Sequence, residues 1–469
     1  LPVSKLLKSI GEAIEASGLK DGMCISFHHH LRSGDYVLNL VMDEIARMGI
    51  KNLTINASSI HDGHAPLIGH MRSGVVTGLE TNYIGPVVGR AISEGVLQKP
   101  VIFRTHGGRP SDIERGVSKI DVAFIAAPTS DPMGNCTGIV GKSACGSLGY
   151  AFADAEHADQ VVVITDNLVE YPLTAFSIAE NFVDYVVCVE AIGNPQGIVS
   201  GTTRMPKDPI ALKIADYAAR AIAASGLLRD GFFFQTGAGG ASLAVAGYLK
   251  EIMLEKHVRG SYALGGITGY MVDMLEAGCF QAIQDVQCFD LRAVESLRSN
   301  PRHREITASH YASPTAKSSA ASSLDVVVLG ATQIDLDFNV NVHTDSLGYI
   351  IGGSGGHTDV AECARMTVIA APLSRGRMSL VVDRVLCKST PGSSVDLLVT
   401  QYGIAVNPTR PKLREALGEA GLPLKEIGEL KALAEGLNGI PMAVERRRDR
   451  VAAKVLNRDG SLLDVIYGV

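Results

Sequence analysis

The chain repeats the same series of segments in its two halves, and this repeat constrains its fold more than any other feature of the sequence. Paired segments that each contain a short apolar run occur in the same order: residues 19–27 and 228–236, 121–126 and 325–330, 156–163 and 362–369, and 183–187 and 395–399. The offset between paired segments stays between 204 and 212 residues. The sequence therefore predicts an internal duplication, with an N-terminal domain over residues 1–225 and a C-terminal domain over residues 226–469.

Short runs of Val, Ile and Leu alternate with amphipathic patterns inside each half. Residues 161–164 and 326–329 are β-branched runs typical of parallel strands that are covered on both faces. Residues 37–48 and 243–253 carry apolar side chains at helical spacing. Alternating strands and helices predict an open α/β sheet in each half, so the expected fold class is α/β with two similar domains.

Three further segments each predict a particular local structure. Residues 208–225 predict one amphipathic helix that bridges the halves, because Pro209 lies near its first turn. The Ser- and Ala-rich residues 309–323 predict a surface loop inside the second half. Residues 451–456 and 462–467 flank the sequence Asn-Arg-Asp-Gly, which predicts a β-hairpin near the end of the chain.

Composition and charge limit the classes of function. The chain has 469 residues, of which 46% are hydrophobic and 20% charged, so it can bury large cores. Its 43 basic and 49 acidic residues form no long run of one sign, which argues against nucleic acid as a partner, because phosphate binding needs clustered Lys and Arg. No apolar run approaches the roughly 18 residues of a membrane helix. Eight scattered Cys without a Cys-x-x-Cys pair favour a cytoplasmic protein.

A glycine-rich turn at residues 235–242 separates an apolar run from a predicted helix. Such a turn exposes backbone N–H groups at a helix N-terminus, a place suited to negative charge. We predict that it stabilises the oxyanion that develops on a thioester carbonyl, through the backbone of Gly237, Ala238, Gly239 and Gly240. A dinucleotide-binding turn and a plain tight turn are the alternatives, and the first lacks its final Gly or Ala because Ser242 stands there.

A second glycine-rich segment follows later in the C-terminal half. This segment exposes backbone without side chains at four positions: Gly352, Gly353, Gly355 and Gly356. We predict that these glycines bind a ligand, which the family resemblance described below implies is the carrier of the thioester. A tight crossing of two chain segments is the alternative.

Histidine and arginine residues follow the short strands predicted in the N-terminal half. We predict that the carboxylates of a polycarboxylate substrate are bound by members of the set His28, His29, His30, Arg104, His106 and Arg109. His61 and His64 either add to this set or are ordinary loop residues. We do not predict a metal site, because adjacent His side chains on a strand point to opposite faces and cannot all bind one ion. The Cys residues have no paired base, so thiol catalysis is not expected.

Four stretches closely resemble the citrate lyase alpha subunit family: residues 21–39 (DGMCISFHHHLRSGDYVLN), 104–110 (RTHGGRP), 143–151 (SACGSLGYA) and 234–246 (FQTGAGGASLAVA). The resemblance covers nearly the whole chain. It implies a transferase that exchanges acetate for citrate on the thioester of an acyl carrier protein. It also implies two similar α/β domains of the CoA-transferase (NagB/RpiA-like) type.

The same resemblance implies the partners of the chain. They are a lyase (beta) subunit and an acyl carrier protein (gamma) subunit in a cytoplasmic, oligomeric complex. No cofactor is expected on this chain, because the CoA-like thioester prosthetic group belongs to the carrier protein.

The second half also resembles acetyl-CoA hydrolases and transferases, whose catalytic Glu lies in a Gly-Ile-His-Thr-Glu-Met stretch. Aligned through residues 271–274, that Glu falls at about Gly265 in this chain. Without a protein carboxylate as nucleophile, the citrate carboxylate must itself attack the acetyl thioester, through a ternary complex and a transient mixed anhydride. The alternative is a covalent acyl-enzyme on Glu80 or Asp335. Three further polar residues either line the site or cap the ends of strands: Gln333, Asn339 and Asn341.

Two other classes of function are alternatives. One is a nicotinamide-dependent oxidoreductase built on residues 237–242, and the other is a non-catalytic scaffold that holds the lyase subunit and the carrier protein. The sequence does not separate citrate from a close analogue such as citramalate, since that choice depends on one or two contacts in the pocket.

Overall fold

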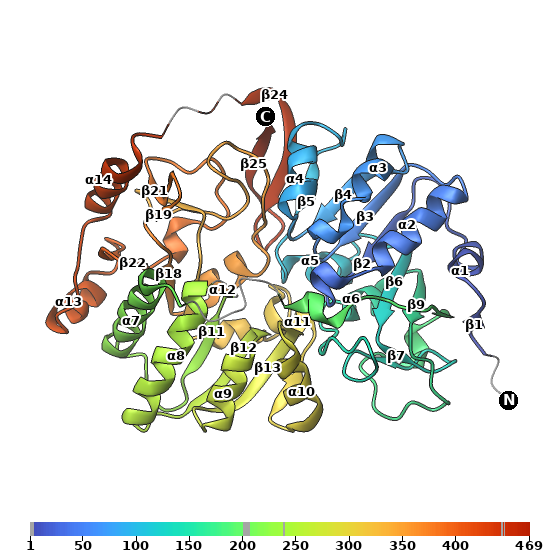
Figure 1. The fold of residues 1–469 in the computed structure, drawn as a ribbon, viewed down its shortest axis with the longest axis horizontal. Coiled ribbons are helices and arrows are strands. Elements are labelled where there is room, and N and C mark those ends of the chain that lie inside the picture. The colour runs from blue at the N-terminus through green and yellow to red at the C-terminus, as the bar shows by residue number, and fades with distance from the viewer. Residues whose placement is uncertain (1–3, 200–206, 238–239, 442–443, 445) are drawn as a thin grey trace.

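The structure is a computed structural model that describes residues 4–199, 207–237, 240–441, 444 and 446–469. Two α/β units lie side by side, each built around one large, mostly parallel sheet (Figure 1). The first sheet has the strand order β1 (Leu6–Leu7), β10 (Tyr185–Cys188), β9 (Gln160–Thr165), β6 (Val122–Ala127), β2 (Cys24–Phe27), β3 (Leu53–Ala57), β4 (Val76–Thr81), β5 (Val101–Phe103), β24 (Arg447–Leu456), β25 (Leu462–Gly468). The second has the order β14 (His303–Glu305), β13 (Phe280–Cys288), β12 (Gly260–Ile267), β11 (Phe233–Thr236), β15 (Val326–Leu329), β18 (Met366–Ala370), β22 (Leu397–Thr400), β23 (Gly403–Val406).

The two sheets share one strand order. Strands β10-β9-β6-β2-β3-β4-β5 of the first unit correspond to β22-β18-β15-β11-β12-β13-β14 of the second. Each pair of repeated sequence segments falls on a corresponding pair of strands: β2 and β11, β6 and β15, β9 and β18, β10 and β22. The predicted fold class, two similar α/β units from an internal duplication, is confirmed.

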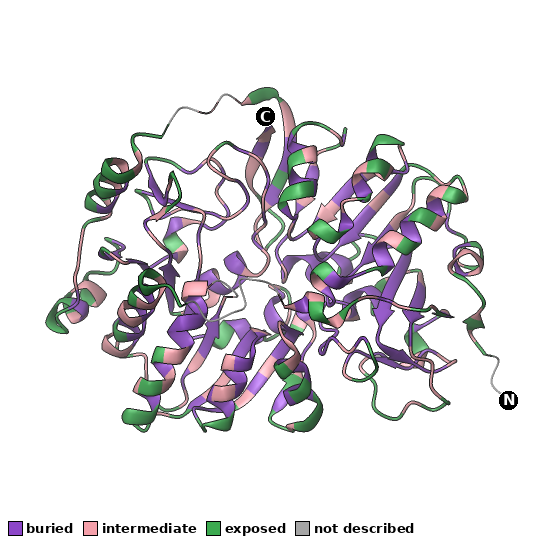
Figure 2. Cartoon of the chain, in the orientation of Figure 1, coloured by how far each residue is buried: buried purple, intermediate pink, exposed green. Residues whose placement is uncertain are grey.

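Helices pack on the sheets through one apolar side each. In α2 (Val37–Arg47), Leu38, Val41, Met42 and Ile45 are buried at spacings of three and four residues. Strands and inner helix faces are buried and outer helix faces are exposed, as Figure 2 shows. The other helices that connect the strands are α1 (Ile10–Ala16), α3 (Leu67–Arg72), α4 (Pro86–Ser93), α5 (Gly108–Glu114), α6 (Phe152–His157), α8 (Gly240–Glu255), α9 (Gly269–Glu276), α10 (Leu291–Ser299), α11 (Ala308–Ala312) and α12 (His357–Cys363).

The chain does not divide between the two sheets at residue 225. The predicted bridging helix is present as α7 (Pro209–Ala224), but it packs against α8 and β18 and so belongs to the second unit. The predicted hairpin is also present, as β24 and β25, but it extends the first sheet, because β24 lies parallel to β5 with Ala453 opposite Val101. The end of the chain therefore crosses back onto the N-terminal unit, between the two units at the top of Figure 1.

Residues 309–323 do not form a surface loop, which corrects the prediction from sequence. They include most of α11 and a 3₁₀ helix at Ala320–Ser323, and Ala312 and Ala321 are fully buried. The helix α11 packs against α5 and α6 of the first unit. Small Ala and Ser side chains permit this close approach, so their abundance marks a contact between the units.

Shorter elements complete the second unit. Helices α13 (Pro411–Glu419) and α14 (Ile427–Asn438) lie at its outer edge in Figure 1. Short strand pairs lie outside the two main sheets: β7 (Thr129–Ser130) with β8 (Cys136–Thr137), β19 (Ser374–Arg375) with β20 (Met378–Ser379), and β16 (Gln333–Asp335) with β17 (Val340–Asn341) and β21 (Val381–Val382). Among the helices of the described residues, none is both long and apolar enough to cross a membrane.

Candidate active site

A cavity of about 720 Å³ lies between the two units, beside the carboxyl ends of their strands. Ligands of open α/β sheets bind at this edge of the sheet. The first unit contributes Tyr83, His106 and Tyr150, which lie in loops. The second unit contributes residues at or beyond the ends of its strands, among them Gln235, Gly240, Gly266, Phe289, Tyr311, Thr332, Gly352, Gly353, Gly356 and Arg375.

The three adjacent histidines after β2 make different contacts. The Nε2 atom of His28 accepts the N–H of Ala126 (2.9 Å), and Nε2 of His30 accepts the N–H of Tyr150 (3.2 Å). The Nδ1 atoms of these two rings contact each other. His28 and His30 are therefore bound to the protein itself and hold Tyr150 in place, so the structure does not bring them to the substrate cavity.

His29 belongs to a stack of rings beside the cavity. Its Nδ1 pairs with the Ser58 hydroxyl (2.6 Å), and its ring centre lies 4.8 Å from that of Tyr150 and 5.5 Å from that of His106. His61, which the sequence left open, extends the stack, because its ring centre is 5.8 Å from that of His29. His64 instead pairs with the buried carboxylate of Asp35 (3.0 Å) and is an ordinary structural residue.

Burial keeps these imidazoles neutral. Desolvation, together with the smaller effect of the Arg109 charge, lowers the pKa of His106 to about 3. The pKa values of His29 and His61 also lie well below the ordinary value for the same main reason. At neutral pH these rings are hydrogen-bonding groups without charge, so the positive charge for a carboxylate must come from elsewhere. Within the described residues, no group of His, Cys, Asp and Glu is arranged to hold a metal ion.

Arg104 and Arg109, predicted to bind substrate, are engaged by internal carboxylates. Arg109 is buried and donates to both oxygens of Asp154 (2.7 and 2.9 Å) and to Oδ1 of Asn56 (2.7 Å). Arg104 donates to Asp112 (2.8 Å) and to Glu80. Neither guanidinium lines the cavity. Both hold loops of the first unit together.

Arg32 is a cation that the sequence reasoning missed. Its guanidinium lies 4.7 Å over the ring centre of Phe289, which lines the cavity, and forms no ion pair with any described residue. Desolvation lowers its pKa, and the nearby phenols of Tyr83 and Tyr150 raise it. Its φ of +49° is rare for a residue other than glycine and indicates a fixed, strained position. The signal was its place two residues after the last of the three histidines.

Arg375, in β19, lines the cavity from the second unit. It too makes no ion pair within the described part of the chain, and burial lowers its pKa. Arg375 lines the cavity and Arg32 contacts its lining residue Phe289, and neither guanidinium pairs with a carboxylate of the described residues.

The first glycine-rich turn borders the cavity, but not all of its N–H groups are free. The N–H of Gly237 donates to the carbonyl of Val328 (2.8 Å), so it is already used. Gly240 begins α8 and lines the cavity. Ala238 and Gly239 lie outside the described residues.

The second glycine-rich segment is both a tight crossing and a wall of the cavity. A Cβ atom on Gly353 would lie 2.2 Å from the carbonyl oxygen of Asn82, and one on Gly352 would lie 2.4 Å from that of Val342. Gly355 has φ of +50°, and its carbonyl accepts the N–H of His106 (2.8 Å). Gly352, Gly353 and Gly356 also line the cavity, and the binding of the thioester carrier by this segment stays a prediction.

The loop that carries His106 is held from the other unit. Asp359, in the first turn of α12, accepts hydrogen bonds from the Thr105 hydroxyl (2.7 Å) and the N–H of Gly107 (2.9 Å). Burial raises the pKa of Asp359 to about 6, although both hydrogen bonds act against the rise. The position of His106 therefore depends on contact between the units.

The polar residues of the β16–β17 hairpin form a local network. Asp335 accepts from the backbone N–H of Asn339 (2.9 Å), and Asn341 donates to Gln333 (3.4 Å) and to Thr344 (3.0 Å). None of the three predicted lining residues, Gln333, Asn339 and Asn341, borders the cavity. Asp335 and Glu80, the alternative nucleophiles, are likewise held elsewhere, and the covalent alternative is not favoured.

The place where related enzymes carry a catalytic Glu has no room for one. Gly265 has φ of +109°, and a Cβ atom there would lie 2.9 Å from the carboxamide of Gln235. A Cβ atom on Gly266 would lie 2.2 Å from the ring of Phe289. Gln235 and Phe289 fill the space, which agrees with the prediction that this chain lacks the acid.

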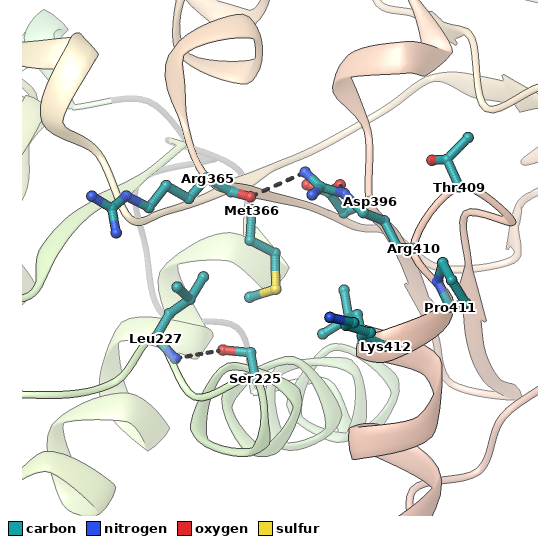
Figure 3. Close-up of a pocket in the computed structure, with 10 residues that line it drawn as sticks. Ser225, Leu227, Arg365, Met366, Asp396, Thr409, Arg410, Pro411 and Lys412 are labelled. Atoms are coloured by element: carbon teal, nitrogen blue, oxygen red, sulfur yellow. Dashed lines mark hydrogen bonds and ion pairs between the residues drawn. The ribbon is translucent and has the colours of Figure 1, made fainter.

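A second hollow, of about 370 Å³, lies at the opposite ends of the strands (Figure 3). Its wall includes Met366 and Arg410, and Arg410 is paired with the buried carboxylate of Asp396. No residue of the predicted site borders this hollow. The cavity between the units therefore remains the candidate active site.

A comparison with protein-family models decides the family. The model described as "Citrate lyase, alpha subunit (CitF)" matches residues 3–469. The chain belongs to the citrate lyase alpha subunit family. The resemblance found in the sequence and the predicted enzyme class, the citrate CoA-transferase component of citrate lyase, are confirmed.

Individual relatives agree with this assignment. The citrate lyase alpha chains of Haemophilus influenzae and Escherichia coli are 48% and 49% identical over 465 residues, which covers 99% of this chain and 93% and 91% of theirs. A solved alpha subunit of citrate lyase from Streptococcus mutans, in complex with citrate, has a TM-score of 0.97 at 50% identity and covers 100% of this chain and 92% of its own. A malonate decarboxylase alpha subunit from Acinetobacter baumannii shares the fold, with a TM-score of 0.67 at 15% identity over 92% of this chain and 88% of its own.

Proposed function

We propose that this chain moves the acyl carrier thioester from acetate to citrate inside the cavity between its units. The main support is that no Asp or Glu of the described residues lines this cavity. A covalent acyl-enzyme on a carboxylate needs such a side chain at the thioester. The cavity instead presents neutral rings, the start of α8 at Gly240 and the guanidinium of Arg375, and the guanidinium of Arg32 lies over the lining ring of Phe289, which suits anionic substrates and a developing oxyanion.

The proposed reaction has two displacements. A carboxylate oxygen of citrate attacks the carbonyl carbon of the acetyl thioester, the C–S bond breaks, and the carrier thiolate leaves with the electron pair. The product is a mixed anhydride of acetate and citrate. The thiolate then attacks the citryl carbonyl carbon of the anhydride, the bond between that carbon and the bridging oxygen breaks, and acetate leaves with this oxygen and the electron pair. Both substrates must be bound together, so proximity supplies much of the rate.

Different residues around the cavity bind the substrates and stabilise the developing charge. Arg32 and Arg375 bind carboxylates of citrate, and His106 and Tyr150 offer hydrogen bonds from the first unit. The N-terminus of α8 at Gly240 stabilises the oxyanion. Gly352, Gly353 and Gly356 line the cavity without side chains, so the thioester arm can approach their backbone closely.

We propose that the chain works in a cytoplasmic complex with the lyase subunit and the acyl carrier protein subunit of citrate lyase. The family is defined as one subunit of a larger enzyme, which supports this assembly. The thioester prosthetic group then belongs to the carrier subunit and enters the cavity as substrate.

A single-turnover experiment with labelled oxygen tests the mechanism. Citrate labelled with ¹⁸O in its carboxylates is mixed with the acetyl carrier protein and an excess of the enzyme. Direct attack transfers one citrate oxygen to the acetyl group, so the acetate released in the first turnover carries one ¹⁸O by mass spectrometry. Unlabelled acetate in the first turnover, with ¹⁸O left on an enzyme carboxylate, would show a covalent acyl-enzyme instead.

A further inference from the structure

Gln235, in the wall of the cavity, has a buried hydrogen-bond acceptor without a partner among the described residues. It lies in β11, is 6% exposed and borders the cavity. Its Nε2 donates to the Tyr311 hydroxyl (2.9 Å), whereas its Oε1 has no partner among the described residues. Buried polar atoms are nearly always paired, so an orphan acceptor in a binding cavity calls for a donor from a ligand.

The carboxamide is fixed in this orientation on several sides. Gly265 lies against one face, since a Cβ atom there would be 2.9 Å from Gln235. Tyr311 holds one edge, and it is itself placed by Gly356, where a Cβ atom would lie 2.5 Å from the phenol oxygen. The other edge carries Oε1, which is buried and has no partner among the described residues. A rigid acceptor of this kind selects among ligands, because it need not reorganise on binding.

The chemistry of citrate identifies the donor. At neutral pH its three carboxylates only accept hydrogen bonds, and its single donor is the hydroxyl group on the central carbon. The carboxylates are matched by Arg32 and Arg375, so the hydroxyl is the group left for an acceptor. We propose that Oε1 of Gln235 accepts the hydroxyl hydrogen of citrate and makes the cavity selective for a hydroxylated tricarboxylate. This inference rests on the proposed function, that citrate reacts in this cavity.

Tricarballylate, which is citrate without its hydroxyl, provides the test. With the complete enzyme and the acetyl carrier protein, kcat/KM for citrate is expected to exceed that for tricarballylate by about 100-fold, because the analogue leaves a buried acceptor unpaired. In the variant Gln235→Met, which keeps the volume but removes the acceptor, the two values should come within about 10-fold of each other, mainly by loss of activity with citrate.

Gln284→Leu is the matched control. Gln284 also has a side-chain oxygen without a partner among the described residues, but it does not border the cavity. This variant should keep the citrate preference of the unmodified enzyme. If Gln235→Met does not fold, calorimetric binding of citrate and tricarballylate to the unmodified enzyme and to Gln235→Glu, which keeps an acceptor and should keep the preference, gives the same comparison.

The outcomes separate this inference from the proposed function. An unchanged citrate preference in Gln235→Met overturns the inference, as does a raised KM for the acetyl carrier protein alone, which would assign Oε1 to an amide of the carrier arm. An unmodified enzyme that reacts with neither tricarboxylate would overturn the proposed function itself.

Discussion

Arg32 and Arg109 are both shielded guanidinium groups, but their surroundings give them different roles. Arg109 shares a bidentate ion pair with Asp154, and each charge there compensates the other. Arg32 rests on the ring of Phe289 and has no carboxylate partner among the described residues. A guanidinium that has no carboxylate partner and lies beside a cavity is suited to binding an anionic ligand.

Substitution of these two arginines should separate binding from stability. Arg32→Gln should raise KM for citrate about 10- to 100-fold, since a hydrogen bond to a charged group contributes about 1.5–3 kcal/mol. Arg109→Gln should lower the free energy of unfolding by about 3–5 kcal/mol, because it leaves the carboxylate of Asp154 buried and unpaired. Steady-state kinetics and urea unfolding measure the two effects. Loss of stability without a change in KM in Arg32→Gln would contradict the assignment.

Among the elements, the segment from Gly352 to Gly356 has the least freedom to change. It passes so close to the loop after β4 that Gly353 cannot carry a Cβ atom without moving the carbonyl of Asn82. Its hydrogen bonds to Asn82 and to His106 fix two loops of the first unit at once. This segment therefore aligns the two walls of the cavity.

Gly353→Ala should reduce activity more than it reduces folding. The added methyl group would push the segment away from Asn82, separate the cavity walls and lower kcat by about 100-fold, as misplacement near 1 Å can do. The control is Gly436→Ala in α14, where a Cβ atom meets nothing within 4 Å. That change should raise the free energy of unfolding by about 0.5–1 kcal/mol and leave kcat unchanged. Equal kcat values for both variants would show that the crossing does not align the site.

At the scale of the whole molecule, buried neutral histidines make stability depend on pH. Burial lowers the pKa of His28 and His357 to about 4, and of His106 and His343 to about 3. Unfolding returns each group to an ordinary value near 6.5, so the unfolded chain binds more protons between pH 6.5 and pH 3–4. Buried carboxyl groups act in the opposite direction, because burial raises the pKa of Asp359 to about 6 and also raises the pKa values of Glu305, Glu362 and Asp396.

The free energy of unfolding should therefore fall as the pH is lowered from 6.5. On unfolding near pH 5 the four histidines take up about four protons and Asp359 loses about one, so the net uptake of about three gives a slope on the order of 4 kcal/mol per pH unit. Urea unfolding followed by circular dichroism between pH 7.5 and 4.5 measures it. A flat profile over this range would mean that the histidines are not buried as neutral groups.

The sequence by itself determined the fold class, because that information is local and repeated. Each half carries the same order of apolar runs, and a run such as residues 326–329 specifies a buried strand wherever it lies. The sequence also placed His106 and the glycines at residues 352–356 near the site, since loops after parallel strands meet at one edge of a sheet.

The tertiary structure decided which of these residues are free to act. Asp154 pairs with Arg109 from 45 positions away, and no local pattern shows that Arg109 is occupied while Arg32 is left without an acid. In the same way, burial by both units turns His106 neutral, and the close packing of Gly265 aims the carboxamide of Gln235 at the cavity. Charge state, pairing and exposure depend on neighbours that are distant in the chain, so only the folded arrangement sets them.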